Sequence, residues 1–345
     1  MNRKFVKAVL ALMLCAAFLL SGCVEYYDIV GFEIEGTTYA VSPKFNNMHD
    51  YSDGLSQVYT RKHETFFVDL TGKKVLETTY TLVTGSFSEG LMHVKNSEGL
   101  YGYIDTAGAL AIPFEFKNAA AFSGGLAVVE KDGGAGYIDT KGQMIIDCQF
   151  EEAYDFSNGM AVIKKGGLYG YIAEDGTIAI EPQFLNAFDF NEELAVVKTE
   201  EGSAYIDKSG NSNKNSRYLE CFSFSEGKGI VLDGLKWVVL NSDMEPQFEL
   251  AYDKVSTFKN NRAIVTQDGL YGLVDELGKE VLAPKYQIIM PFSDDLALVV
   301  NDGKCGYIDT AGNEVIPCQF REAKSFSDEV AVVNVMGRYG LINKP

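Results

Sequence analysis

Histidine often supplies a base or a metal ligand near neutral pH, so the three histidines of this 345-residue chain come first. They are His49, His63 and His93, all within the first 93 residues. The sequence holds no His-Glu-x-x-His motif, no Gly-x-Ser-x-Gly turn and no glycine-rich phosphate loop. Catalysis needs unlike groups gathered at one place. We therefore expect surface or edge histidines, no metal site, no cofactor and no enzymatic activity.

Aspartates that begin short Asp-x-x-Gly segments offer a second chemistry. These aspartates are Asp105, Asp139, Asp207, Asp275 and Asp309. A ladder of carboxylates would suit calcium, which prefers hard oxygen ligands. An aspartate that begins a hairpin turn can instead accept hydrogen bonds from the amides of that turn, which glycine ends with a positive φ. Because each aspartate is at least a full repeat from its next copy, we interpret all five as turn caps.

Aromatic residues at one recurring position are the better candidates for a ligand surface. They are Tyr101, Tyr169, Trp237, Tyr271 and Tyr339. Sugar rings can stack on a row of aromatic side chains, whereas packing in the core is the more ordinary role. The unit that carries Trp237, residues 205–258, has also lost its turn glycine, at Met244. It is either a specialised ligand patch or a repeat that has drifted.

These positions belong to a repeat with a period of 34 residues. A phenylalanine recurs at this spacing, usually within Phe-Ser-x-Gly/Glu-Leu, at Phe122, Phe156, Phe190, Phe224, Phe258, Phe292 and Phe326. Phe87 and Tyr51 extend the series with spacings of 35 and 36 residues. The nine markers predict about nine tandem structural units.

Each unit has the pattern of short β-strands. In one unit, the runs at 126–131, 136–140 and 144–148 are rich in β-branched and aromatic residues, and glycine or aspartate bounds them. We predict a three-stranded antiparallel meander, followed by an extended link that carries Phe150, Ala153 and Phe156. One meander cannot bury its apolar face alone, so neighbouring units must stack.

The segment Gly-Leu-Tyr-Gly-Tyr-Ile-Asp-Thr-x-Gly, with the later Phe-Ser-x-Gly-Leu-Ala-Val-Val, resembles the WG-repeat family of bacterial β-repeat proteins. The resemblance covers about residues 38–345. Tryptophan itself stands only at position 237, while tyrosine takes the slot in several other units. The resemblance implies a bacterial, often surface-associated array without assigned chemistry.

The fold class expected is therefore all-β, a tandem array of about nine three-stranded antiparallel units. The repeats start at the second strand of a unit, at 38–42, and end with a first strand, at 340–343. These complementary half-units could pair and close a ring. Propeller blades usually hold four strands in about 40–45 residues. Because the present unit is shorter, we expect an open or superhelical array, with a closed propeller-like ring as the alternative.

Six cysteines occur, and four of them, Cys148, Cys221, Cys305 and Cys318, lie well inside the repeats. Disulfide-stapled domains carry cysteine far more densely than this. We interpret the four as small core residues.

The first 22 residues are typical of a secretory signal peptide. Arg3, Lys4 and Lys7 precede an uncharged apolar run, which ends in Leu-Ser-Gly-Cys23. This ending resembles the lipobox of bacterial lipoproteins and implies cleavage before Cys23 and lipidation of that cysteine. Residues 23–37 would form a tether and entry strand, and residues 38–345 the repeat domain. Cleavage would change the net charge from −18 to −21, because the removed segment holds three basic and no acidic residues.

We expect a non-catalytic binding or scaffolding lipoprotein of the bacterial cell envelope. It would be held at the membrane by its N-terminal lipid and would contact a protein or a cell-wall polymer through a repetitive β surface. An acidic chain of this kind is a poor partner for nucleic acid. The alternative is a glycan- or peptidoglycan-active enzyme with an unrecognised carboxylate site.

Overall fold

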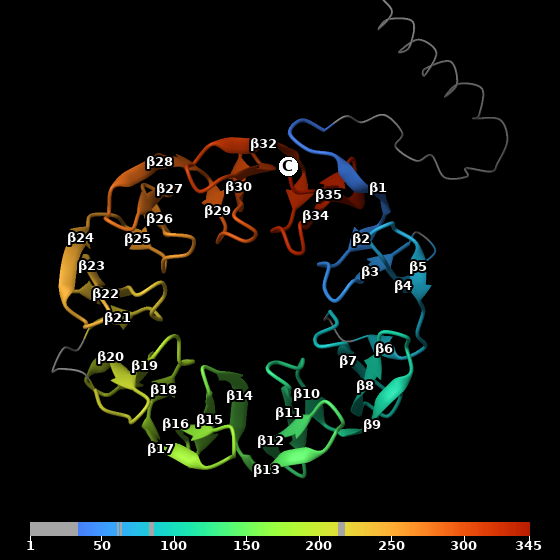
Figure 1. Ribbon diagram of the computed structural model, residues 1–345, viewed down its shortest axis with the longest axis horizontal. Coiled ribbons are helices and arrows are strands. Elements are labelled where there is room, and N and C mark those ends of the chain that lie inside the picture. The colour runs from blue at the N-terminus through green and yellow to red at the C-terminus, as the bar shows by residue number, and fades with distance from the viewer. Residues whose placement is uncertain (1–33, 61, 63, 83–85, 213–217) are drawn as a thin grey trace, which may run out of the picture.

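Nine small antiparallel sheets surround a common axis and form a closed nine-bladed β-propeller (Figure 1). The computed structural model describes residues 34–60, 62, 64–82, 86–212 and 218–345. Cys23, the signal segment and His63 lie outside this part of the chain. The described residues contain strands and turns but no helix, and so no helix that could cross a membrane.

The sheets are numbered here as blades 1 to 9 in chain order, and the strands of each blade are given from the inside of the ring outward. Blade 1 holds β2 (Asn47–Met48), β3 (Ser56–Tyr59), β4 (Thr65–Val68) and β5 (Lys74–Leu76); blade 2 holds β6 (Thr81–Leu82), β7 (Leu91–Lys95), β8 (Tyr101–Asp105) and β9 (Leu110–Phe116); blade 3 holds β10 (Asn118–Ala119), β11 (Leu126–Lys131), β12 (Gly134–Asp139) and β13 (Met144–Phe150). Blade 4 holds β14 (Glu152–Ser157), β15 (Met160–Lys165), β16 (Leu168–Ala173) and β17 (Ile178–Phe184); blade 5 holds β18 (Asn186–Ala187), β19 (Leu194–Thr199) and β20 (Gly202–Asp207); blade 6 holds β21 (Glu220–Cys221), β22 (Gly229–Asp233), β23 (Lys236–Leu240) and β24 (Pro246–Leu250). Blade 7 holds β25 (Lys254–Val255), β26 (Arg262–Gln267), β27 (Leu270–Asp275) and β28 (Glu280–Tyr286); blade 8 holds β29 (Ile288–Ile289), β30 (Ala297–Asn301), β31 (Lys304–Ile308) and β32 (Glu314–Phe320); blade 9 holds β33 (Glu322–Ala323), β34 (Val330–Val335), β35 (Arg338–Asn343) and β1 (Tyr39–Phe45).

Most blades thus have four strands, and the prediction of three-stranded units is wrong in this respect. The segment expected to be a link contains the missing strand. In blade 3 this innermost strand is only two residues long and pairs Asn118 with Glu130 and Ala119 with Val129. Four strands fit into 34 residues because the first one needs so few.

The ring is closed by the two ends of the repeat region. β1 lies beside β35 as the outermost strand of blade 9, and it pairs Tyr39 with Ile342 and Val41 with Leu341. The expected all-β array of nine antiparallel units is therefore confirmed, and of its two forms the chain adopts the closed ring. The preference for an open array is wrong, because it rested on a blade size that counted a full-length first strand.

A glycine follows the position of Tyr101 on the third strand of most units, as Gly102 does in blade 2 and Gly136 at the equivalent place in blade 3, because the outer strand comes very close there. A Cβ on Gly136 would lie 2.7 Å from the carbonyl carbon of Asp147 and still closer to the oxygen of Ile146. The outer strand approaches this closely because the register shifts between Ala135 and Tyr137. A bulge of this kind bends the outer strand toward its neighbour.

The unit that carries Trp237, in blade 6, lacks both this glycine and the register shift beside it. In blade 6 the glycine slot holds Val238, which pairs directly with Glu249, and Trp237 and Val239 pair in the same unbroken register. Without the shift at this point, the outer strand leaves room for a side chain. The loss of glycine and the loss of the bulge are therefore one structural change.

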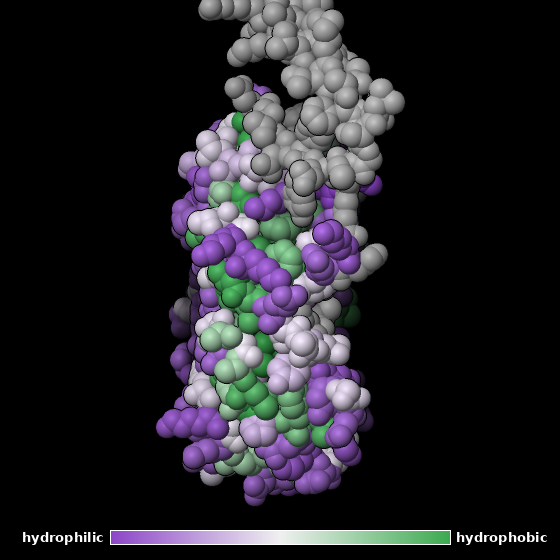
Figure 2. All heavy atoms as spheres, turned by 90° about the vertical axis from the view of Figure 1, so that its right-hand side faces the viewer, coloured by the Kyte–Doolittle hydropathy of each residue, from purple (hydrophilic) through white to green (hydrophobic). Residues whose placement is uncertain are grey.

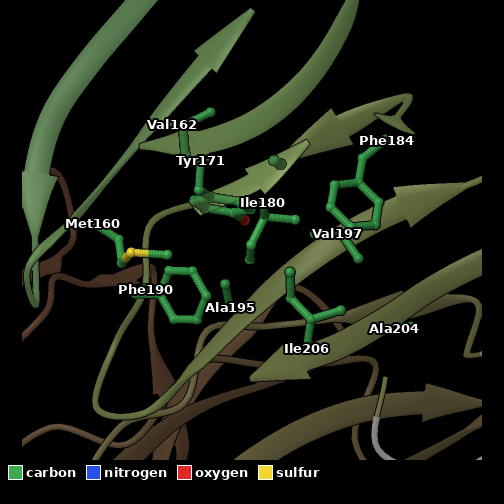
Figure 3. Close-up of a cluster of buried hydrophobic side chains, with 11 residues drawn as sticks. Met160, Val162, Tyr171, Ile180, Phe184, Phe190, Ala195, Val197, Ala204 and Ile206 are labelled. Carbon is green, nitrogen blue, oxygen red and sulfur yellow. The ribbon is translucent and has the colours of Figure 1, made fainter. Parts of the chain in front are cut away.

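The core lies between successive blades and not within any one of them. Figure 3 shows the cluster between blades 4 and 5, where Tyr171 and Ile180 of blade 4 meet Phe190, Val197 and Ile206 of blade 5. Each large apolar side chain buried in this way stabilises the ring by roughly 1.5–3 kcal/mol. Seen edge-on, the molecule is a narrow disc, and on the side that faces the viewer apolar residues form a band between hydrophilic edges (Figure 2).

Candidate functional site

The inner wall of the ring is formed by the short first strand of each blade and the residues that follow it, up to the marker phenylalanine (Figure 1). The marker and the apolar position three residues before it recur from blade to blade, whereas the position two residues before the marker varies. In chain order it holds His49, Ala120, Tyr154, Phe188, Phe222, Ser256, Met290 and Lys324 among the described residues. Aromatic rings therefore gather on three successive blades, 4, 5 and 6.

Two of these three rings are open to solvent. The exposed fractions of Tyr154 and Phe188 are 44% and 41%. Phe222 is half-buried because its ring stacks on Trp237, with centroids 5.4 Å apart and planes 15° from parallel. A folded chain gains nothing by leaving large rings in water, and neighbouring exposed rings are a common mark of an interaction surface.

A carboxylate follows each of the two exposed rings. Asp155 and Asp189 are solvent-exposed, and within the described chain neither makes a hydrogen bond or an ion pair. Desolvation by the surrounding wall raises the pKa of both carboxyls, and for Asp155 the charge of Asp189 raises the pKa further. We call Tyr154, Asp155, Phe188, Asp189 and Phe222 the inner arc.

The same wall shows what partner such a carboxylate can take. In blade 1 the equivalent aspartate, Asp50, lies 3.1 Å from the ammonium nitrogen of Lys324, which occupies the ring position of the preceding blade, blade 9. By the repeat, Ala120 of blade 3 occupies the place of that lysine opposite Asp155, and Tyr154 occupies it opposite Asp189. Neither supplies a positive charge.

Two clefts open on the wall at the ends of the inner arc. One, of about 300 Å³, lies between blades 3 and 4 and is lined by Ala120, Val128, Glu130, Tyr154 and Asp155 among others. The other, of about 310 Å³, lies between blades 5 and 6, with Phe188, Lys198, Glu220, Cys221 and Phe222 in its lining. The first cleft coincides with the place where Ala120 stands instead of a lysine.

A polar network holds Tyr154 in position. Glu152 accepts hydrogen bonds from the Tyr154 hydroxyl at 2.7 Å, the Tyr169 hydroxyl at 3.2 Å and the Lys164 ammonium at 2.7 Å. The hydrogen bond from Lys164 is the main reason that the pKa of Glu152 is lowered. The hydrogen bond to Glu152 raises the pKa of Tyr154, so its hydroxyl remains a donor at neutral pH.

The five aromatic residues predicted as a ligand surface lie on five different blades, and no ring contact joins any two of them in the described chain. Tyr101, Tyr169, Tyr271 and Tyr339 are half-buried and pack against the cores between blades. Lysine ammonium groups lie over two of the rings, those of Tyr101 and Tyr169. Trp237 is only 7% exposed and donates a hydrogen bond to the Asp253 carbonyl at 3.4 Å. Of the five, Tyr169 is linked to the inner arc through Glu152, and Trp237 through its stacking on Phe222.

The prediction that the repeated aspartates cap turns is confirmed. Asp139 accepts hydrogen bonds from the backbone amides of Lys141 and Gln143, at 2.9 and 2.8 Å. The same pair of bonds occurs at Asp105, Asp207, Asp275 and Asp309. Among the described residues, no group of three or more histidine, cysteine or acidic side chains could hold a metal ion.

His93 differs from its expected place at the surface. It is half-buried beside Tyr101 and Tyr103, its Nδ1 atom has no hydrogen-bond partner among the described residues, and burial lowers its pKa. The four cysteines carry free thiols and pack against the cores, as predicted. Burial raises the pKa of Cys221 to about 12 and that of Cys318 to about 11, which keeps both thiols in their unreactive form.

Fold and repeat together define the class of this protein, a closed β-propeller of nine repeat-encoded blades. A family model described as the WG containing repeat matches residues 101–134, 136–169, 169–201, 240–271, 271–305 and 306–339. These segments cover more than half of the chain, and the chain belongs to this family. No curated protein matches the sequence.

Several solved structures are similar in fold. The computationally designed Ika8 protein has a TM-score of 0.44 and 14% identity over 75% of this chain and 94% of that one. BamB from Moraxella catarrhalis has a TM-score of 0.39 and 8% identity over 86% and 92% of the two chains. The dihydro-heme d1 dehydrogenase NirN, in complex with DHE, has a TM-score of 0.43 and 13% identity over 82% and 73%. Likenesses this distant carry no conclusion about function.

Proposed function

We propose that this protein is a non-catalytic binding or scaffolding lipoprotein of the bacterial cell envelope. One observation carries the proposal: on the successive blades 4 and 5, the inner wall presents an exposed aromatic ring followed by a carboxylate that has no hydrogen bond or ion pair within the described chain. Such a wall offers a ready-made surface for a partner. The WG-repeat propeller is compatible with this role.

The proposed location rests on the N-terminal sequence. An apolar run of this length suits a signal peptide, and the Leu-Ser-Gly-Cys23 ending suits lipidation. The partner would be a protein or a cell-wall polymer met outside the cytoplasm. The acidic balance of the chain disfavours nucleic acid.

A retention experiment on isolated envelopes tests the binding role. Full-length wild-type protein and a Tyr154→Ala/Phe188→Ala variant would be used to capture envelope components after mild detergent extraction. The wild type should retain at least one protein or polymer that the double variant loses. If the wild type retains nothing, the binding proposal fails. Trp237→Ala would be a poor probe, because a buried tryptophan stabilises the fold by roughly 3–5 kcal/mol.

Anchoring is tested separately by Cys23→Ala. The variant should move from the membrane pellet to the soluble fraction, because one or more acyl chains would be lost. Ser21→Ala, which changes the same segment but leaves the thiol in place, is the matched control. Retention of the Cys23→Ala protein in the pellet would contradict the lipidation proposal.

A glycan-active enzyme remains the second candidate, and the neighbouring carboxyls of Asp155 and Asp189 are the observation in its favour. Glycoside hydrolases use two carboxyl groups, one of them with a raised pKa. Hydrolysis of purified cell-wall glycan by the wild type, lost in Asp155→Asn, would support this candidate over the binding role.

A further inference from the structure

The inner arc has an empty place for a positive charge, and the chain itself shows how that place is filled elsewhere. On the wall between blades 9 and 1, Lys324 pairs with Asp50. Between blades 3 and 4 the same arrangement has Ala120 in place of the lysine, Asp155 with no hydrogen bond or ion pair to any described residue, and a cleft of about 300 Å³ beside both. The small side chain of alanine leaves space where a lysine chain would run.

A second carboxylate without a cationic partner lies on the same wall, between blades 4 and 5. Asp189 of blade 5 is also without a hydrogen bond or ion pair in the described chain, and the residue in the lysine position of blade 4 is Tyr154. An aromatic ring attracts a cation over its face, and the chain already places Lys164 over Tyr169 at 5.1 Å. A cation near Asp189 would therefore meet a carboxylate and a ring together.

We propose that the inner arc binds a lysine-rich or arginine-rich segment of a partner protein, with one cationic side chain in the cleft beside Asp155 and another between Asp189 and the ring of Tyr154. The inference rests on the proposed binding role and names the partner's chemistry. An extended segment suits the site because Asp155 and Asp189 lie on neighbouring blades along the same wall. The acidic balance of the chain favours the approach of a cation over long distances.

Fluorescence anisotropy with full-length protein, solubilised in mild detergent, tests this proposal. The probe is a labelled peptide of alternating lysine and glycine residues, measured at about 0.15 M salt so that general charge attraction is screened. Asp155→Asn/Asp189→Asn should weaken peptide binding about tenfold, the change expected when a paired charge is lost. Asp268→Asn/Asp302→Asn removes the same charge from hairpins outside the arc and should change binding less than about twofold. Equal weakening by the two pairs would overturn the proposal.

A second variant fills the cleft without removing any carboxylate. Ala120→Lys recreates the pairing seen between Lys324 and Asp50 and leaves Asp189 free, so it should weaken peptide binding by no more than the roughly tenfold loss in Asp155→Asn/Asp189→Asn, while the protein keeps or gains thermal stability. Met290→Lys makes the same charge change at the same wall position of blade 8, where Ser325 and not an aspartate follows on blade 9. Binding should survive in Met290→Lys. If Ala120→Lys and Met290→Lys weaken peptide binding equally, or if neither weakens it, the cleft beside Asp155 is not the binding place.

The two proposals can fail independently. If wild-type protein captures an envelope component that Asp155→Asn/Asp189→Asn captures equally well, the binding role holds and the basic-segment inference fails. Displacement of the envelope partner by soluble cell-wall fragments, but not by the lysine peptide, would likewise overturn the inference and assign the arc to a polymer. If the lysine peptide displaces the partner, the inference is supported.

Discussion

The Ser88 hydroxyl donates a hydrogen bond of 2.7 Å to the carbonyl oxygen of Phe122, which lies 34 residues further along the chain and on the next blade. The same bond joins Ser52 to Phe87, Ser157 to Phe190 and Ser225 to Phe258. Acidic residues next to several of these serines add bonds to backbone amides of the following blade, as Glu226 does to Asn260. Several neighbouring blades are thus joined by polar contacts beside the marker phenylalanine.

Ser88→Ala should lower the free energy of unfolding by about 1 kcal/mol, because a part-buried hydrogen bond between blades is lost. Ser123→Ala is the matched control: Ser123 occupies the same position on blade 3, and no hydrogen bond of its hydroxyl is found in the described chain. Urea unfolding followed by fluorescence measures both. Equal effects of the two substitutions would show that the hydroxyl bond contributes nothing.

Gly136→Ala should destabilise the ring by about 1–3 kcal/mol, the usual cost of forcing an extra atom into a packed site. The added methyl group would press on the backbone of Asp147 in the outer strand. Ala204→Gly is the reverse control on blade 5, where an alanine already occupies this slot, and it should cost less than about 1 kcal/mol. The thermal midpoints of the two variants give the comparison, and a Gly136→Ala protein as stable as the wild type would refute the close approach.

The architecture was largely predictable because its signals recur along the chain, the marker phenylalanine or tyrosine in nine units and the turn aspartate in five. The turn aspartates and the Tyr-Gly dipeptides each reflect one local requirement, a capped hairpin or a glycine under a bulged strand. The first strand was missed because a two-residue strand such as Asn118–Ala119 is too short to show alternation of apolar and polar residues. The preference for an open array over a closed ring is wrong for a related reason, since a unit with such a short first strand is smaller than the usual propeller blade.

The candidate site does not follow from the repeat, because its side chains stand at positions that differ from blade to blade. The wall position that holds Tyr154 and Phe188 varies from alanine to lysine, and so it stands outside the pattern. One signal was present: an aromatic residue followed by aspartate occurs before the marker phenylalanine in two successive units, Tyr154-Asp155 and Phe188-Asp189. The tyrosines at the recurring position were predicted as the ligand surface, but packing between blades leaves them half-buried.

Asp155→Asn/Asp189→Asn should make the protein more stable than the wild type at neutral pH. Both carboxyls have a folded-state pKa above the ordinary value of 3.8, so ionisation is less favourable in the folded state than in the unfolded state. At pH values well below 3.8 both states are protonated and the difference vanishes. As the pH rises from about 3.8 through the raised folded-state pKa, the two carboxyls ionise in the unfolded state first, and the stability of the wild type falls relative to the variant.

Thermal midpoints of the two proteins between about pH 3.5 and pH 7 measure this difference, which should grow with pH and then level off once the folded-state pKa is passed. Asp268→Asn/Asp302→Asn, which removes two negative charges outside the arc, is the matched control for the change in net charge. If Asp155→Asn/Asp189→Asn is less stable than the wild type at pH 7, the two carboxylates stabilise the fold. That result would argue against their role in binding a partner.

Val41→Asp should open the ring. Val41 is 3% exposed in the closing strand, where it pairs with Leu341 of β35 and packs in the core between blades 9 and 1. An unpaired carboxylate there would cost several kcal/mol, about 3 or more, or would force β1 out of blade 9. Ser42→Asp places the same charge on the neighbouring exposed residue of the same strand and should be nearly neutral. Small-angle scattering should show an expanded or self-associating Val41→Asp protein, since release of β1 leaves β35 with an unpaired edge. A compact monomer with wild-type stability would mean that blade 9 closes without its fourth strand.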